Sequence, residues 1–142
     1  MVYLEKKFRF ETAHRLGNGY VGKCANIHGH SWNGSIQVEA EELDKFGMGV
    51  DYSELGSIIK KIEKDLDHKL ILWDEDELVE NLDGKTELVL LPENPTSEVL
   101  AKTIFGEVAF EIRKRNLPCR LVKVTIEETC TTRCEYYGKE GK

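Results

Sequence analysis

Three of the four histidines in this chain are grouped at two neighbouring points of the sequence, and their spacing indicates a metal site. His14 ends the run that begins at Phe8, and His28 and His30 open the next apolar stretch. Residues two apart in a β-strand point to the same face, so His28 and His30 can direct their imidazoles into one space, and His14 shares a face with Phe8 and Phe10. Three neutral imidazoles that leave one coordination position open are typical of a catalytic zinc site. The competing interpretation is that these are solvated or hydrogen-bonded core histidines.

Cys24 lies four residues before His28, in a loop that carries several glycines. A thiol can take a proton from a substrate once a metal or a nearby cation favours its thiolate form. Cys24 can instead be a fourth zinc ligand, which would close the site and make the chain a non-enzymatic zinc-binding module. The other cysteines do not form the dense framework of a small secreted protein stabilised by disulfides; they are Cys119, Cys130 and Cys134.

Two acidic groups complete the set of candidate residues. Asp67 directly precedes the fourth histidine, His68, and a carboxylate beside an imidazole can fix its tautomer and stabilise its charged form during proton transfer. Glu128 is in register with Val124 and Ile126, on the strand face that should be buried. A buried carboxylate needs hydrogen-bonding or charged partners. Glu128 therefore marks either a strand end that has reached water or a group that binds the N–H donors of a ligand.

Alternating and helical patterns predict the elements that position these residues. The predicted strands cover residues 2–14, 30–40, 121–129 and 133–137, with a loop at residues 16–23 between the first two. A helix begins after the N-cap Asp51, with Glu54 at the capping-box position, and a second begins at Pro95. Residues 73–91 read as an acidic, irregular stretch with a short strand at residues 87–91. The order ββααββ favours an α+β fold.

Composition limits the class of protein. A chain of 142 residues fits a single domain (1–142) with its own core. Twenty basic and twenty-six acidic residues give a formal charge of −6, and no long basic run indicates nucleic-acid binding. The N-terminus has no apolar signal segment, and no apolar run reaches membrane-spanning length. We therefore expect a cytoplasmic protein with no membrane partner.

Taken together, the chain resembles the 6-pyruvoyl-tetrahydropterin synthase family, and most closely its 6-carboxy-tetrahydropterin synthase branch. Six motifs carry the resemblance, in the family's order and over nearly the whole chain. They are Phe10-Glu-Thr-Ala-His14, Cys24-Ala-Asn-Ile-His28-Gly-His30, Val50-Asp51-Tyr52, Leu66-Asp67-His68, Asn94-Pro-Thr-Ser-Glu98 and Glu128-Thr-Cys-Thr.

The resemblance implies the tunnelling fold, in which a four-stranded antiparallel sheet carries two helices inserted after its second strand. It also implies a homo-oligomer, a trimer or a hexamer, with active sites at subunit interfaces. The family's functional residues map onto specific positions of this chain. These are the zinc ligands His14, His28 and His30, the catalytic residues Cys24, Asp67 and His68, the pterin anchor Glu128, and the pocket-lining Thr96, Ser97 and Glu98.

The implied reaction is that of a zinc-dependent lyase. It converts 7,8-dihydroneopterin triphosphate to 6-carboxy-5,6,7,8-tetrahydropterin, with release of acetaldehyde and triphosphate, on the route to queuosine. Synthesis of 6-pyruvoyl-tetrahydropterin is the alternative within the fold, but those members usually have a longer spacing between the cysteine and His-Gly-His. A folate-pathway variant is disfavoured because residues 25–27 contain no glutamate. Lys23, Arg15 and Lys69 lie near the motifs and are candidates for binding the triphosphate, and the sequence does not select among them.

Overall fold

The computed structural model describes residues 1–139. Its elements follow in the order β1 (Val2–His14), η1 (Lys23–Ala25), β2 (His28–Ala40), α1 (Tyr52–Leu66), β3 (Leu70–Trp73), α2 (Leu78–Leu82), β4 (Leu88–Leu91), α3 (Ser97–Lys114), β5 (Arg120–Glu127) and β6 (Cys134–Tyr136). The predicted strands, the two long helices and their order are confirmed.

The long hairpin of β1 and β2 is the element that carries the histidines. Alternating apolar and charged residues give each strand one buried and one exposed face. The two strands pair antiparallel from Val2 opposite Ala40 to His14 opposite His28, without interruption. His14 and His28 are therefore direct cross-strand neighbours, and His30, opposite Thr12, is one step further along the same face.

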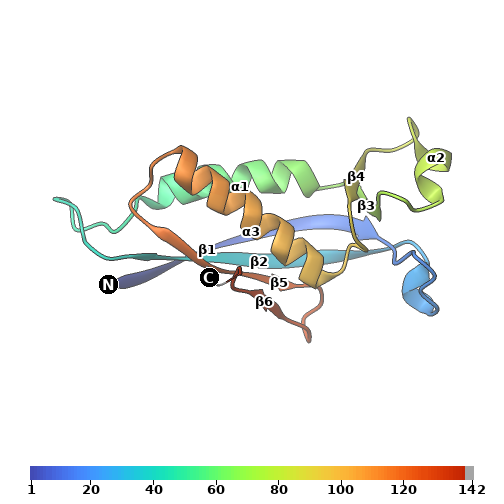
Figure 1. Cartoon of the computed structure of the whole chain (residues 1–142), viewed down its shortest axis with the longest axis horizontal. Coiled ribbons are helices and arrows are strands. Elements are labelled where there is room, and N and C mark those ends of the chain that lie inside the picture. Colours follow the sequence, from blue (N-terminus) through green and yellow to red (C-terminus); the bar gives the residue numbers. More distant parts are fainter. Residues whose placement is uncertain (140–142) are drawn as a thin grey trace.

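The sheet has six strands in the order β4-β3-β1-β2-β5-β6, and two of them were not part of the predicted four-stranded antiparallel sheet. β3 pairs parallel to the end of β1, and β4 pairs parallel to β3 (Figure 1). The stretch predicted as irregular also contains the short helix α2. The run Leu70–Trp73 escaped prediction because four consecutive apolar residues carry no alternating pattern, as is usual for buried parallel strands.

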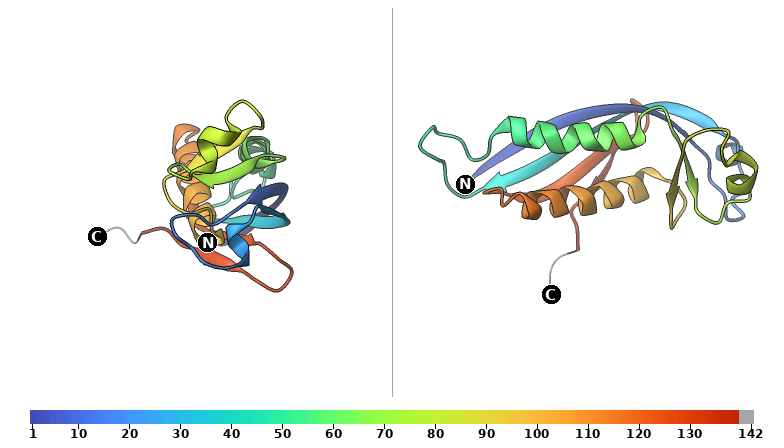
Figure 2. Two further views of the ribbon diagram at one scale, coloured as in Figure 1. Left: turned by 90° about the vertical axis from the view of Figure 1, so that its right-hand side faces the viewer. Right: turned by 90° about the horizontal axis from the view of Figure 1, so that it is seen from above.

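α1 and α3 lie side by side across one face of the sheet (Figures 1 and 2). Asp51 caps α1 by accepting a hydrogen bond from the backbone N–H of Ser53, as predicted for an N-cap. Among residues 1–139, no side-chain bond from Glu54 completes a capping box, and its carboxylate lies 3.5 Å from Arg115 instead. Thr96 caps α3 through its hydroxyl, which accepts from the N–H of Val99.

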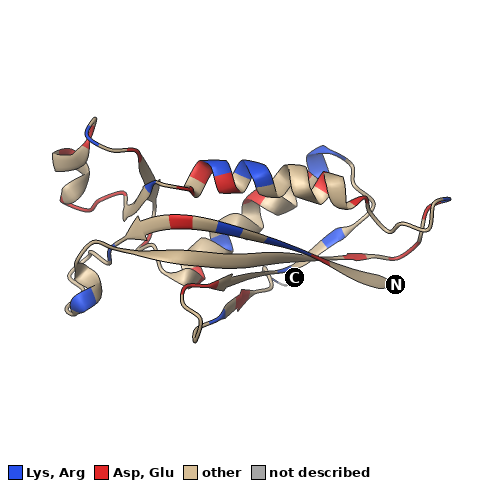
Figure 3. Cartoon of the chain, turned by 180° about the vertical axis from the view of Figure 1, so that it is seen from behind, with Lys and Arg blue, Asp and Glu red and all other residues tan. Residues whose placement is uncertain are grey.

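Within the described part of the chain, the other face of the sheet carries no helix and is polar. Acidic and basic side chains are interspersed along β1 and along the outer surface of α1 (Figure 3). Neither element therefore carries charges of a single sign along its length. Among residues 1–139, no helix is both long enough and apolar enough to cross a membrane.

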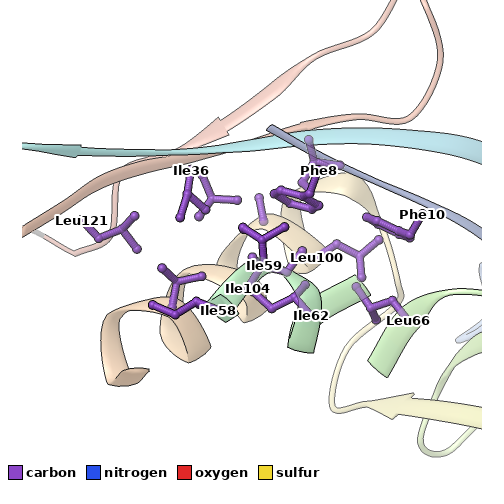
Figure 4. Close-up of a cluster of buried hydrophobic side chains, with 14 of the residues drawn as sticks. Phe8, Phe10, Ile36, Ile58, Ile59, Ile62, Leu66, Leu100, Ile104 and Leu121 are labelled. Atoms are coloured by element: carbon purple, nitrogen blue, oxygen red, sulfur yellow. The ribbon is translucent and has the colours of Figure 1, made fainter. Parts of the chain in front are cut away.

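The hydrophobic core lies between the two long helices and the sheet (Figure 4). Phe8, Phe10 and Ile36 from the sheet meet Ile58 and Leu100 from the helices, and all five are at most 5% exposed. Burying such side chains is the main source of stability for a domain of this size. The core ends near Trp32, and the histidines continue the same face beyond it, close to the first residues of α3.

Candidate functional site

The imidazoles of His14, His28 and His30 meet at one end of the molecule. Their ring centroids are 4.6 Å apart for His14 and His28, 5.2 Å for His14 and His30, and 5.0 Å for His28 and His30. One potential ligand atom from each residue lies within 4.8 Å of the others, and this is a spacing that one metal ion can bridge. Their meeting follows from the strand register, which places all three on the same face.

Backbone carbonyls hold two of the rings in the tautomer that a metal ligand requires. His14 Nδ1 donates to the carbonyl of Pro95 at 2.7 Å, and His28 Nδ1 donates to the carbonyl of Asn26 at 2.7 Å. The Nε2 atoms of these rings are thereby left as acceptors. Nε2 of His14 and Nε2 of His30 are buried without a hydrogen-bond partner. Buried polar atoms are rarely left unpaired, so these two nitrogens fit metal ligands.

The surroundings of His14 and His30 favour the neutral form of these two imidazoles. Burial is the main cause that lowers the pKa of His14, and the neighbouring His28 and His30 lower it further. Burial also lowers the pKa of His30. Trp32 packs its ring at right angles against both of these residues and in turn stacks on Phe10. Neutral, orientated imidazoles bind a divalent cation without first losing a proton.

Glu128 lies at the histidine cluster, although β5 ends one residue before it and not at residue 129 as predicted. Its Oε1 is 3.2 Å from Nε2 of His14 and 3.5 Å from Nε2 of His30, yet neither pair has the alignment of a hydrogen bond. The side chain is 29% exposed, so the strand end has not fully reached water. Glu128 is thus a partly buried carboxylate facing the site.

Cys24 lies in the short helix η1, in the loop between the two histidine strands. Its thiol is free and partly buried. The cluster of potential ligand atoms within residues 1–139 contains the three histidines and does not include Cys24.

Asp67 and His68 lie at the edge of β1, directly after α1. One oxygen of the Asp67 carboxylate accepts from the backbone N–H of Glu11 at 2.7 Å, and the other accepts from Nδ1 of His68 at 2.8 Å. These bonds lower the pKa of Asp67, and the bond from Glu11 has the larger effect. The His68 side chain is 80% exposed and projects Nε2 away from Asp67. His68 and His30 line the same open cavity of about 460 Å³.

The segment Thr96-Ser97-Glu98 forms the start of α3. The Thr96 hydroxyl is used as the helix cap, and the Ser97 hydroxyl donates to Glu98 at 3.3 Å. Glu98 is exposed in the first turn, where a negative charge also favours the helix dipole. Pro95, directly before this segment, contacts His14 through its carbonyl, and no local pattern of residues predicts this contact.

Comparison with known proteins decides the family. The sequence profile described as 6-pyruvoyl tetrahydropterin synthase matches residues 3–139. The chain belongs to this family. A Haemophilus influenzae protein named 6-carboxy-5,6,7,8-tetrahydropterin synthase is 33% identical over 148 residues, which cover 96% of this chain and 99% of that protein. A Bacillus subtilis protein of the same name is 34% identical over 139 residues, covering 97% and 86%.

Solved structures agree with this family membership. The 6-pyruvoyl tetrahydropterin synthase of Caenorhabditis elegans superposes with a TM-score of 0.72 at 27% identity, covering 97% of this chain and 96% of that one. An uncharacterized protein of Wolinella succinogenes superposes with a TM-score of 0.81 at 20% identity, covering 97% and 98%. The tunnelling fold expected from the sequence is therefore confirmed, with six strands in this member.

Within this synthase scaffold, the structure separates the three candidate basic residues. Arg15 is paired with Asp76 through Nε at 2.8 Å and Nη2 at 2.5 Å, so its charge is already neutralised. Lys69 lines the cavity shared by His30 and His68. Lys23 is exposed in η1, at the surface of the loop that carries Cys24. Of the three, Lys69 and Lys23 are free to bind an anion.

Proposed function

We propose that this chain is a 6-carboxy-5,6,7,8-tetrahydropterin synthase. It converts 7,8-dihydroneopterin triphosphate and one water molecule to 6-carboxy-5,6,7,8-tetrahydropterin, releasing acetaldehyde and triphosphate, as a step toward queuosine. The observation that carries the proposal is the group of three imidazoles with two unpaired buried nitrogens, adjacent to the Cys24 loop. The names of the full-length bacterial relatives support the choice of product.

Zinc is the cofactor that the donor set fits. His14, His28 and His30 would hold it, since two of their Nε2 atoms are buried without a partner and the Nδ1 atoms of His14 and His28 are bonded to carbonyls. When bound, zinc stabilises negative charge developing on the substrate's side chain, so that its C–H and O–H protons become easier to remove.

The protein's own groups then move the protons. In this proposal Sγ of Cys24 accepts a proton from the substrate's side chain, and Nε2 of His68 acts as the second acid or base. Asp67 fixes the tautomer of His68 by accepting from its Nδ1 and stabilises the ring when it is protonated. All of this is acid–base chemistry, and the lyase class follows from the loss of triphosphate and acetaldehyde.

Substrate recognition is assigned to the acidic and polar residues around the cluster. The Glu128 carboxylate would accept two N–H donors from the pyrimidine edge of the pterin, a charge-assisted pairing that excludes rings without those donors. Thr96, Ser97 and Glu98 would line the pterin pocket. Lys69 and Lys23 are the available cations for the triphosphate.

We propose further that the single domain works in the cytoplasm as a homo-oligomer, a trimer or hexamer, whose sites are shared between chains. The exposure of His68 in one chain supports this assembly, because an acid–base group needs contact with substrate to act. No nucleic acid or membrane partner is implied.

Product identification is the decisive experiment. Zinc-loaded protein is incubated with 7,8-dihydroneopterin triphosphate, and the pterin product and acetaldehyde are measured by mass spectrometry and an aldehyde-trapping assay. We expect 6-carboxytetrahydropterin with equimolar acetaldehyde. Accumulation of 6-pyruvoyltetrahydropterin without acetaldehyde would assign the chain to the other activity. His28→Ala should lose bound zinc and turnover together.

Replacement of Cys24 tests the division of roles between metal and base. We expect Cys24→Ala to keep its zinc and to lose about 10²–10⁴-fold in kcat, which is the usual contribution of a positioned proton-transfer group. Cys130→Ala, at an exposed turn, is the matched control and should be unaffected. If Cys24→Ala loses zinc along with turnover, the cysteine is a ligand and the chain fits the closed zinc module.

A further inference from the structure

The carboxamide of Asn94 is hydrogen-bonded in both directions to the backbone of Gly17, a residue 77 positions earlier in the chain. The Gly17 N–H donates to Asn94 Oδ1 at 2.9 Å, and Asn94 Nδ2 donates to the Gly17 carbonyl at 3.1 Å. These two hydrogen bonds resemble the pair exchanged by opposite residues of antiparallel strands, with the Asn94 carboxamide in place of one strand's backbone. The contact fixes both the position and the orientation of the Gly17 peptide groups.

Gly17 is next to the residue that holds Cys24. The N–H of Leu16 donates to the carbonyl of Cys24 at 2.8 Å, across the loop. Arg15, one residue earlier, adds a weaker bond from Nη1 to the carbonyl of Ala25 at 3.4 Å. The first residues after β1 are thus bonded to the backbone of η1 on one side and to Asn94 on the other.

The structure leaves no room for a side chain at Gly17. A Cβ atom at this position would lie 2.8 Å from Oδ2 of Asp76, whose buried carboxylate is itself held by Arg15. The residue after Asn94 supplies the Pro95 carbonyl that holds the imidazole of His14. One short segment therefore binds both the end of β1 and the loop that returns to Cys24.

We infer that Asn94 is a positioning residue that sets the location of Cys24 relative to the three-histidine cluster. This inference rests on the proposed function only in giving Cys24 the role of a base. The tie to His14 passes through a main-chain carbonyl and remains when the Asn94 side chain is replaced. The side chain therefore positions the cysteine loop and not the metal ligands.

The test compares Asn94→Ala and Asn94→Asp with the wild type. The aspartate variant keeps the acceptor for the Gly17 N–H and loses the donor to the Gly17 carbonyl, so it decides the question if the alanine variant does not fold. Asn81→Asp is the control, because Asn81 lies in α2 and its side chain makes one long bond, to the carbonyl of the N-cap residue Glu77 at 3.4 Å. Zinc content, kcat, KM and the rate of Cys24 alkylation by iodoacetamide are measured, the last by peptide-resolved mass spectrometry on zinc-loaded protein.

We expect both Asn94 variants to keep one equivalent of zinc and a near-normal KM. We expect kcat to fall about 10²-fold, as displacement of a catalytic group by about 1 Å can cause, and the alkylation rate of Cys24 to change with it. A purely structural contact would leave kcat and Cys24 reactivity of the folded protein unchanged, and that result overturns the inference. Loss of zinc in either folded variant overturns it as well. The alkylation arm needs no substrate, so it decides the inference even if the proposed reaction fails.

Discussion

At the scale of single residues, the candidate site depends on two buried atoms, Nε2 of His14 and Nε2 of His30. Glu128 Oε1 lies close to both atoms, at 3.2 Å from Nε2 of His14 and 3.5 Å from Nε2 of His30. Two roles are open to a carboxylate at this position, binding the pterin or joining the metal. The two roles predict opposite results for zinc content.

Glu128→Gln separates these roles. We expect this variant to keep its zinc and to bind pterin more weakly by about 2–4 kcal/mol, because one charged hydrogen bond is lost and one ligand donor is left unpaired. Calorimetric titration with a pterin and metal analysis of the same samples provide the measurement. Glu127→Gln, whose carboxylate lies 3.7 Å from Arg133, is the control. Loss of zinc in Glu128→Gln would identify Glu128 as a ligand.

His68 has a backbone φ of 58°, in the left-handed region that residues other than glycine seldom adopt. Such conformations often occur at functional sites, where the surrounding structure maintains them. We expect His68→Gly to change the free energy of unfolding by less than about 1 kcal/mol, since relief of strain offsets the added freedom of the unfolded chain. Turnover should fall by at least about 10²-fold.

Asn116 provides the comparison for this prediction, because it has a φ of 51° after α3, away from the site. Asn116→Gly should change stability by a similar amount and leave turnover intact. Chemical unfolding and steady-state kinetics measure the two properties. A His68→Gly variant with normal turnover would remove His68 from the reaction.

At the scale of elements, Asp76 connects the β3–α2 turn to the loop after β1. Its side chain is 0% exposed and accepts bonds from Arg15 and from the N–H of Leu78 at 2.9 Å. The bond from Arg15 is the main cause that lowers the pKa of Asp76. The folded state thus binds this proton less readily than the unfolded state does, so the contribution to stability is complete above the unfolded pKa of about 3.9.

This linkage gives a prediction for acid unfolding. The stabilisation by Asp76 should be lost as the pH falls below about 4 and through the lowered pKa of the folded protein. At pH 7, Asp76→Asn should reduce the free energy of unfolding by about 3 kcal/mol, because Arg15, only 17% exposed, loses its charged partner. In urea unfolding experiments, the difference in the free energy of unfolding between this variant and the wild type should become smaller toward pH 3. Asp74→Asn, at an exposed neighbouring position, should show no such difference at pH 7.

The elements that could be predicted are those whose apolar residues repeat at a regular spacing within a short stretch of sequence. Leu55, Ile58 and Ile62 recur at helical spacing, and the alternation of β1 and β2 sets the face on which the histidines lie. Short parallel strands such as β3 lack a periodic signal of their own. The bonds from Pro95 to His14 and from Asn94 to Gly17 join residues about 80 positions apart, so only the folded chain shows them.

For the whole molecule, the position of His68 predicts how chains cooperate. The imidazole of His68 is exposed and hydrogen-bonded to Asp67, on the wall of the open cavity that His30 also lines. We therefore expect Cys24→Ala and His68→Ala proteins to be inactive alone and to regain activity when unfolded and refolded as a mixture. If sites lie between adjacent chains of a ring, random mixing restores about one quarter of the sites.

Native mass spectrometry of the same mixture would show whether the assembly is a trimer or a hexamer. The control mixes Cys24→Ala with Cys24→Ala,His68→Ala; no chain in this mixture has Cys24, so it should stay inactive. Absence of restored activity in verified mixed oligomers would place Cys24 and His68 of each site in a single chain.

All three imidazoles come from one hairpin. This shared origin determines the order in which the parts of the site can assemble during folding. Closing the β1–β2 hairpin needs only contacts between neighbouring strands, whereas the Pro95 carbonyl must reach His14 from 81 residues away. Local contacts form sooner than distant ones, because they cost less chain entropy. A nascent chain can thus present its complete set of imidazoles before α3 has docked. Zinc captured at that stage would act as a nucleus for the hairpin, and docking of α3 would fix the ring of His14 last.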